Sequence, residues 1–146
     1  MIPFNDFASE YQSIKKEIDQ AISKVLNSGW FVLGKELEQF EKEFANYLDI
    51  KYCVGVGSGT DAITLSLMAL DIGDKDEVIT TNLTAFPTIT GIIRSGAKPV
   101  VVDILINDGL INTNLIKQKI NKRTKAIVPV HLYGQSCEMN KINSIA

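Results

Sequence analysis

Residues 55–62, Gly-Val-Gly-Ser-Gly-Thr-Asp-Ala, decide the fold, because three glycines separate a strand-like stretch from a helical pattern. The pattern predicts a strand over Lys51–Val56 and a mostly apolar helix over Thr60–Leu70. Glycines let the backbone turn sharply, and the unpaired N–H groups in the first turn of a helix attract anions. Ser58 and Thr60 would add hydroxyl donors; the alternative is a tight turn in which Ser58 only caps the helix. The stretch therefore predicts a phosphate site inside an α/β protein.

After this loop, predicted strands alternate with predicted helices. The patterns predict strands over Glu77–Thr81, Pro99–Asp103 and Ala126–Leu132, and helices over Pro87–Arg94, Thr113–Lys119 and from Met139 onward. Such alternation produces βαβ units with right-handed crossovers and a parallel sheet. The continuous apolar strand 99–103 is of the kind that is buried on both faces of such a sheet.

Single residues mark where these elements begin and end. Thr84 and Thr113 are candidate N-caps of the helices that follow them, and Gly96 lies just past the end of the first of these helices. Pro129 cannot donate a ladder hydrogen bond, so it predicts either a sheet edge or the end of the strand.

Two amphipathic helices are predicted before the glycine loop. Apolar residues recur at helical spacing over 14–26 and again over 37–48, and the glycine-bounded loop Ser28–Gly34 joins the two. The predicted organisation is a helical segment, 1–50, followed by an α/β domain, 51–146. A doubly wound sheet would normally continue past the last predicted helix, so the α/β domain is expected to be truncated.

Composition excludes several classes of protein. Apolar residues make up 45% of the chain and charged residues 22%, and 17 acidic against 15 basic residues give a net charge of -2. Lys and Arg form no stripe, which argues against nucleic acid and anionic membranes as partners. No apolar run approaches the roughly 20 residues that span a bilayer, and the opening residues do not form a secretory signal. Cys53 and Cys137 have no metal-ligand spacing, so they are expected to be reduced, buried thiols of a cytoplasmic protein.

The glycine loop departs from both common nucleotide-binding patterns. A P-loop requires a Gly-Lys-Ser/Thr ending, and no lysine follows these glycines. The dinucleotide fingerprint requires a glycine where this chain has Thr60, and an acidic residue near the end of the second strand, where this chain has Thr80, Thr81 and Asn82. Both of these nucleotide-binding interpretations are therefore weakened.

Several motifs together resemble the sugar aminotransferases of the DegT/DnrJ/EryC1/StrS type. The matching segments, in order, are Ser28–Gly34, Phe40-Glu41, Gly57–Ala62, Asp76–Ile79, Gly96–Val100 and Pro129–Gln135. The resemblance covers essentially the whole chain. It implies the N-terminal portion of a fold-type-I enzyme whose large domain binds pyridoxal 5'-phosphate.

The resemblance also implies a reaction and partners. Enzymes of this type aminate a keto group on a nucleotide-linked sugar, here with glutamate as the expected amino donor, and the full-length form is expected to be a homodimer. The amino-acid sequences of Ser28–Gly34 and Leu83–Phe86 are most similar to those of enzymes that act on the 3-keto position of a thymidine-diphosphate-linked deoxysugar. A 4-keto substrate is the close alternative.

Carried over residue by residue, the resemblance assigns a cofactor site. Ser58, Gly59 and Thr60 would hold the cofactor phosphate. Many members have an aromatic residue over the pyridine ring where this chain has Ala85, and the adjacent Phe86 would take that role; the alternative is a core phenylalanine at a helix start. Asp61 would repel the phosphate if it pointed inward, so it is expected to point away and to cap the helix or bind a neighbouring strand.

Other candidate residues carry an equal or stronger structural interpretation. His131 and Asp103 each close a predicted strand, and for both a structural role is favoured over a functional one. Trp30 and Phe31 match the family segment that borders the active site, and packing between the two helices is the alternative.

The chemistry that the resemblance implies is incomplete in this chain. Transamination needs a lysine that forms a Schiff base with the cofactor and a carboxylate beside the pyridine nitrogen. In the family both follow the segment matched by Gly134-Gln135, and no lysine here falls at that motif, so the lysine is expected beyond Ala146. The chain alone is thus predicted to be inactive; the rival interpretations are a non-catalytic module that binds a phosphorylated ligand and an inactive gene fragment.

Overall fold

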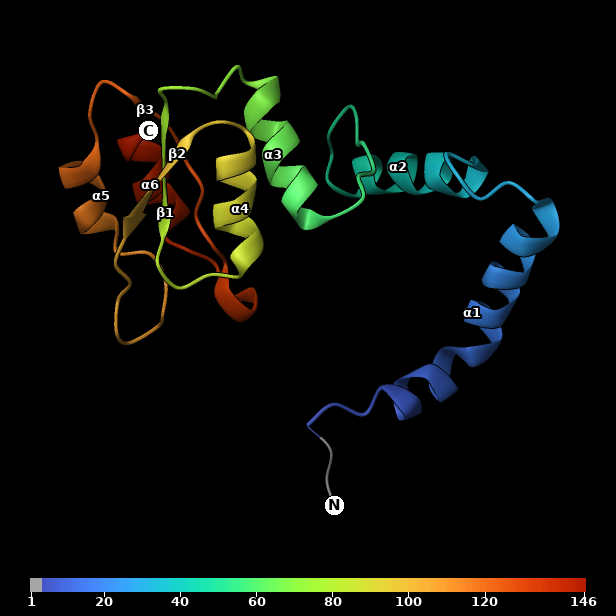
Figure 1. The fold of residues 1–146 in the computed structure, drawn as a ribbon. Helices are drawn as coiled ribbons and strands as arrows, with labels where there is room; N and C mark the ends of the chain where they lie inside the picture. Colours follow the sequence, from blue (N-terminus) through green and yellow to red (C-terminus); the bar gives the residue numbers. More distant parts are fainter. Residues whose placement is uncertain (1–3) are drawn as a thin grey trace. The chain divides into compact units, whose positions relative to one another are not determined.

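The computed structural model describes residues 4–146, which form two compact units (Figure 1). The first unit extends to Gly55 and the second comprises Val56–Ala146. No helix in the described part of the chain is long and apolar enough to cross a membrane.

The first unit consists of the two predicted amphipathic helices, α1 (Phe7–Ser28) and α2 (Lys35–Tyr47). Asp6 caps α1 by accepting a hydrogen bond from the backbone N–H of Ser9 at 3.0 Å, and α1 ends at Gly29 in the left-handed conformation (φ 65°). Burial of the apolar faces is slight, since α1 has no buried residue and α2 has only Ala45. The helices are therefore set by local pattern and capping more than by a shared core.

The second unit is built on a parallel sheet with the strand order β2-β1-β3. The strands are β1 (Glu77–Thr81), β2 (Lys98–Val102) and β3 (Thr124–Ile127). Ile79 of the central strand pairs with Val100 on one side and with Ile127 on the other. All five residues of β1 are buried, so β1 is the strand around which the core is organised.

Helices cover both faces of this sheet (Figure 1). They are α3 (Gly59–Ala69), α4 (Phe86–Arg94), α5 (Thr113–Lys119) and α6 (Met139–Ile145), with a short 3-10 turn at Leu132–Gly134. Successive strand residues point to opposite faces, so Val78 joins the core under α3 and α4, while Ile79 joins the core under α5 and α6. This arrangement confirms the predicted α/β class with βαβ units.

The strand predicted over Lys51–Val56 is wrong. The segment has no regular secondary structure, and the side chains of Tyr52 and Val54 are 73% and 76% exposed. A strand needs ladder partners, and the described sheet contains only β2, β1 and β3, so residues 51–56 pair with none of them. The local pattern could not reveal that this segment lacks a pairing partner.

The predicted double burial of residues 99–103 is also wrong. In the described sheet β2 is an edge strand, and Val101 is 49% exposed. The predicted strand at 126–132 is shorter than expected, because β3 ends at Ile127, two residues before Pro129. The interpretation of Pro129 as a mark of the strand end is confirmed.

The N-caps of two helices lie one residue away from the predicted positions. Ala85 occupies the N-cap position of α4 without a side-chain hydrogen bond, and the Thr84 hydroxyl instead contacts the Thr88 hydroxyl at 2.7 Å. Asn112, not Thr113, caps α5, its side-chain oxygen accepting from the N–H of Asn114 at 3.1 Å. The start of a helix depends on which side-chain acceptor reaches the free N–H groups of its first turn.

Candidate functional site

The glycine loop leads directly into α3, and Ser58 caps that helix. The Ser58 hydroxyl oxygen accepts a hydrogen bond from the N–H of Asp61 at 3.1 Å, and the Ser58 carbonyl accepts one from the N–H of Ala62 at 3.0 Å. The capping interpretation of Ser58 is thereby confirmed. In Figure 1, α3 and α4 both run opposite to β1, so the N-terminal ends of the two helices point toward the end of the unit where β1 finishes.

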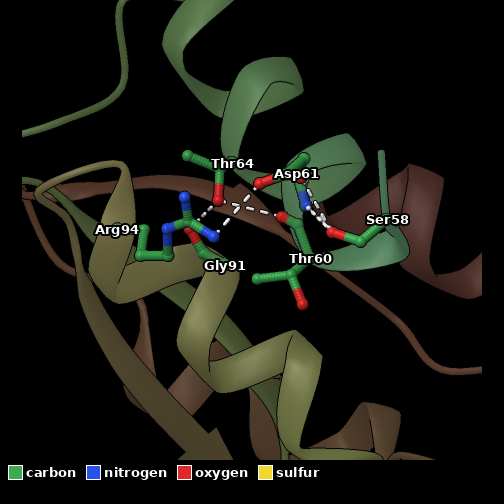
Figure 2. A network of polar contacts seen from close by, with 6 residues as sticks. All are labelled: Ser58, Thr60, Asp61, Thr64, Gly91 and Arg94. Atoms are coloured by element: carbon green, nitrogen blue, oxygen red, sulfur yellow. Dashed lines mark hydrogen bonds and ion pairs between the residues drawn. The ribbon is translucent and has the colours of Figure 1, made fainter. Parts of the chain in front are cut away.

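The first turn of α3 keeps donors that nothing in the described chain uses. Within residues 4–146, no hydrogen bond engages the N–H groups of Gly59 and Thr60 or the Thr60 hydroxyl. Figure 2 shows the Thr60 hydroxyl pointing away from the polar network around it. A Cβ placed on Gly59 would meet nothing within 4 Å, so the backbone there is open to a ligand. Two free amides, a hydroxyl and the positive end of a helix dipole suit a phosphate.

Asp61 points away from these free donors, as predicted. Its Oδ1 forms an ion pair with Nη1 of Arg94 at 3.1 Å, and its Oδ2 accepts a hydrogen bond from the Ser58 hydroxyl at 2.9 Å (Figure 2). Its partners are thus a side chain of α4 and the N-cap residue Ser58, and not a neighbouring strand. Because a hydroxyl has one proton, the Ser58 hydroxyl cannot donate to a phosphate while it donates to Asp61.

A close contact between α3 and α4 fixes this first turn. The Thr64 hydroxyl lies 2.9 Å from the carbonyl of Thr60 and 3.1 Å from the carbonyl of Gly91, so its proton is shared between the two helices. A Cβ on Gly91 would lie 2.8 Å from Cβ of Ile63 and 3.1 Å from the carbonyl oxygen of Thr60. The helices can approach this closely only because residue 91 is glycine.

The roles of Arg94, Thr64 and Gly91 were not predicted from the sequence. The one available signal was a glycine inside a helical pattern, which often indicates close packing. Nothing in the pattern indicated that Arg94, 33 positions after Asp61, would contact it.

Phe86 is the first residue of α4 and is 80% exposed. The alternative that Phe86 is a core residue is therefore wrong. An exposed ring at the start of a helix that points toward the end of β1 remains available to cover a ligand.

The other candidate residues have structural partners. Nδ1 of His131 accepts the backbone N–H of Cys137 at 3.1 Å, which supports the structural interpretation of this histidine. Oδ1 of Asp103 accepts the side-chain amide of Asn82 at 2.9 Å and the N–H of Ile104 at 2.8 Å. These two hydrogen bonds, that from Asn82 first, hold the pKa of Asp103 below its usual value.

The burial of the loop Ser28–Gly34 and of the two cysteines differs in part from the prediction. Trp30 and Phe31 are 52% and 64% exposed, so they are not buried between α1 and α2. Both cysteines are free, and Cys137 is buried as predicted, while Cys53 is only half-buried. No cluster of His, Cys, Asp and Glu that could hold a metal ion occurs among residues 4–146.

Comparisons with known proteins agree on one family. Residues 12–146 match the DegT/DnrJ/EryC1/StrS aminotransferase family. The chain is 50% identical, over its whole length, to a dTDP-3-amino-3,6-dideoxy-alpha-D-galactopyranose transaminase of Aneurinibacillus thermoaerophilus. It is 44% identical, over 94% of its length, to a dTDP-3-amino-3,4,6-trideoxy-alpha-D-glucose transaminase of Micromonospora megalomicea subsp. nigra. The chain spans only 40% and 37% of these two relatives.

Solved structures also match most of this chain. The structure of DesV of S. venezuelae in complex with a ketimine intermediate is 40% identical and matches 99% of this chain with a TM-score of 0.94, although it is covered over only 39% of its own length. The structure of ntda of Bacillus subtilis with bound cofactor PMP is 38% identical over 92% of this chain, with a TM-score of 0.87 and 31% of its own length covered.

Proposed function

The chain belongs to the DegT/DnrJ/EryC1/StrS aminotransferase family, and from this we propose that it supplies the N-terminal part of a pyridoxal-phosphate-dependent aminotransferase acting on a nucleotide-linked keto-deoxysugar. The observation that carries the proposal is the set of free donors at the start of α3. When bound, pyridoxal phosphate supplies an electron sink for moving an amino group from a donor to a keto carbon.

Each residue of the proposed site has a distinct task. The N–H groups of Gly59 and Thr60 and the Thr60 hydroxyl bind the phosphate, which anchors the cofactor by its charge. Ser58 keeps the first turn of α3 in place through its capping bond and adds its hydroxyl when its proton turns from Asp61 toward the phosphate. The exposed ring of Phe86 covers the face of the pyridine and excludes water from it.

The proposed substrate is a thymidine-diphosphate-linked 3-keto-6-deoxyhexose. Two relatives named as transaminases of dTDP-3-amino sugars support this choice over the 4-keto alternative. We propose glutamate as the amino donor and a homodimer as the full-length form. The free cysteines are consistent with the cytoplasm as the proposed location.

Thr60→Val is expected to weaken the binding of pyridoxal phosphate to the chain about tenfold, because the isosteric change removes a hydroxyl donor to a charged group. Thr90→Val is the matched control, since the Thr90 hydroxyl bonds only to the carbonyl of Phe86 within its own helix, at 3.1 Å. The measurement is a titration of the chain with pyridoxal phosphate, followed by cofactor absorbance, with inorganic phosphate as competitor. Absence of saturable binding by the unmodified chain at millimolar cofactor would contradict the proposed function.

We further propose that the lysine that reacts with the cofactor lies outside residues 1–146. Reduction of the cofactor-loaded chain with borohydride is therefore expected to leave all 13 lysines without selective labelling. Mass spectrometry of proteolytic fragments measures this outcome. Stoichiometric labelling of one lysine would place the reactive amine inside this segment and overturn the proposal.

A further inference from the structure

We propose that Arg94 is a positioning residue of the phosphate site: it holds and neutralises the Asp61 carboxylate so that a dianionic phosphate can bind at the first turn of α3. This inference rests on the proposed function. It concerns two residues outside the donor set already assigned to the phosphate.

Asp61 creates an electrostatic conflict in the proposed site. It is the third residue of α3, one position after Thr60, whose free N–H and hydroxyl are two of the proposed phosphate donors. A carboxylate near the N-terminus of a helix stabilises the helix dipole, but it repels a second anion bound at the same end. The chain must therefore offset the Asp61 charge if a phosphate is to bind there.

Arg94 is placed to do this from the neighbouring helix. Its Nη1 lies 3.1 Å from Oδ1 of Asp61, and the Asp61 side chain is only 34% exposed, so solvent screens its charge incompletely. Arg94 closes the last turn of α4, and the Thr64 hydroxyl ties that helix to α3 at Gly91. The packing of the two helices thus places Arg94 beside Asp61, and the ion pair itself orients the Arg94 side chain, which is 56% exposed (Figure 2).

The second oxygen of Asp61 gives Arg94 a further effect. In the structure Oδ2 accepts the Ser58 hydroxyl proton at 2.9 Å. For Ser58 to donate to a phosphate, its O–H must rotate away from this oxygen, and no proton is transferred. Arg94 then remains as the partner that keeps the carboxylate on the α4 side of the turn. Arg94 therefore acts on the phosphate through Asp61 and Ser58, without touching it.

The test is a double-mutant cycle on the full 146-residue chain. Arg94→Gln, Asp61→Asn and the double variant are titrated with pyridoxal phosphate and, separately, with inorganic phosphate. Thermal melting by circular dichroism reports whether each variant keeps its fold. Lys98→Gln is the matched control, because it removes one positive charge from an exposed side chain at the start of β2.

Arg94→Gln is expected to lower the affinity for both ligands on the order of tenfold when Asp61 is present. In the Asp61→Asn background the same change is expected to lower the affinity less than about twofold. Lys98→Gln is expected to change affinity by less than about twofold, since an exposed charge away from the site is screened. An equal loss in both backgrounds would overturn the inference, because Arg94 would then act on the phosphate directly or through the fold. If the unmodified chain binds neither ligand, the proposed function itself fails; if it binds and Arg94→Gln has no effect, only the positioning role fails.

Discussion

Replacing Gly91 by valine is expected to lower the free energy of unfolding of the second unit by about 3 kcal/mol, because overpacking a tight contact forces side chains and backbone to move. Even the first added carbon would lie 2.8 Å from Cβ of Ile63 and 2.9 Å from its Cγ2. It would also lie 3.1 Å from the carbonyl oxygen of Thr60, an atom of the main chain that cannot turn aside. The strain is therefore expected to push the first turn of α3 away from α4.

The sign of the stability change caused by Gly91→Ala shows whether helix propensity or the close contact with α3 dominates. In an exposed helix, alanine is more favourable than glycine by about 1 kcal/mol. At position 91 the helix-propensity gain is opposed by the contact with Ile63, so we expect a net loss of stability of about 1 kcal/mol or more. The control is Gly59→Ala, the same change in the first turn of α3, where an added Cβ meets nothing within 4 Å.

Urea denaturation followed by far-ultraviolet circular dichroism measures all three variants. Gly59→Ala is expected to shift the free energy of unfolding by less than about 0.5 kcal/mol, as is usual for substitutions that disturb no packing. A Gly91→Ala variant as stable as the unmodified chain would show that α3 and α4 do not need this close approach.

Replacing Ile79 by alanine is expected to cost about 3–4 kcal/mol of stability, in the range measured for large-to-small substitutions at fully buried sites. Ile79 is 0% exposed and lies in the middle of β1, paired with Val100 and Ile127. It packs into the core formed with α5 and α6, where few neighbours can move to fill the cavity. A loss of this size is a large fraction of the stability of an ordinary domain.

Val101→Ala is the matched control for Ile79→Ala. Val101 also lies in a strand of the sheet, but on its edge and 49% exposed, so we expect a loss below about 1 kcal/mol. Denaturant unfolding gives the energies, and hydrogen exchange of the β1 amides reports whether the central strand opens first. A loss below about 1 kcal/mol for Ile79→Ala would mean that the core around β1 is loosely packed.

Most of the secondary structure could be predicted from local pattern. The boundaries of β1 and the existence of α1 to α6 follow from local pattern, because apolar residues recur along the chain at spacings typical of each kind of element. The two errors about strands share one cause. The unpaired segment 51–56 and the exposed edge of β2 have the same apolar composition as a central strand, and only the pairing of whole strands separates them.

The glycine loop shows the same division within the site. The sequence by itself determined that Ser58 begins a helix, that donors remain free beside it, and that the motifs around it belong to one aminotransferase family, because capping chemistry and motif order are local properties of the chain. Only the tertiary structure decided that Asp61 faces Arg94 and that Gly91 lets α4 approach α3. These contacts join residues about 30 positions apart, and the geometry that brings them together exists only once two helices pack on the same face of a sheet.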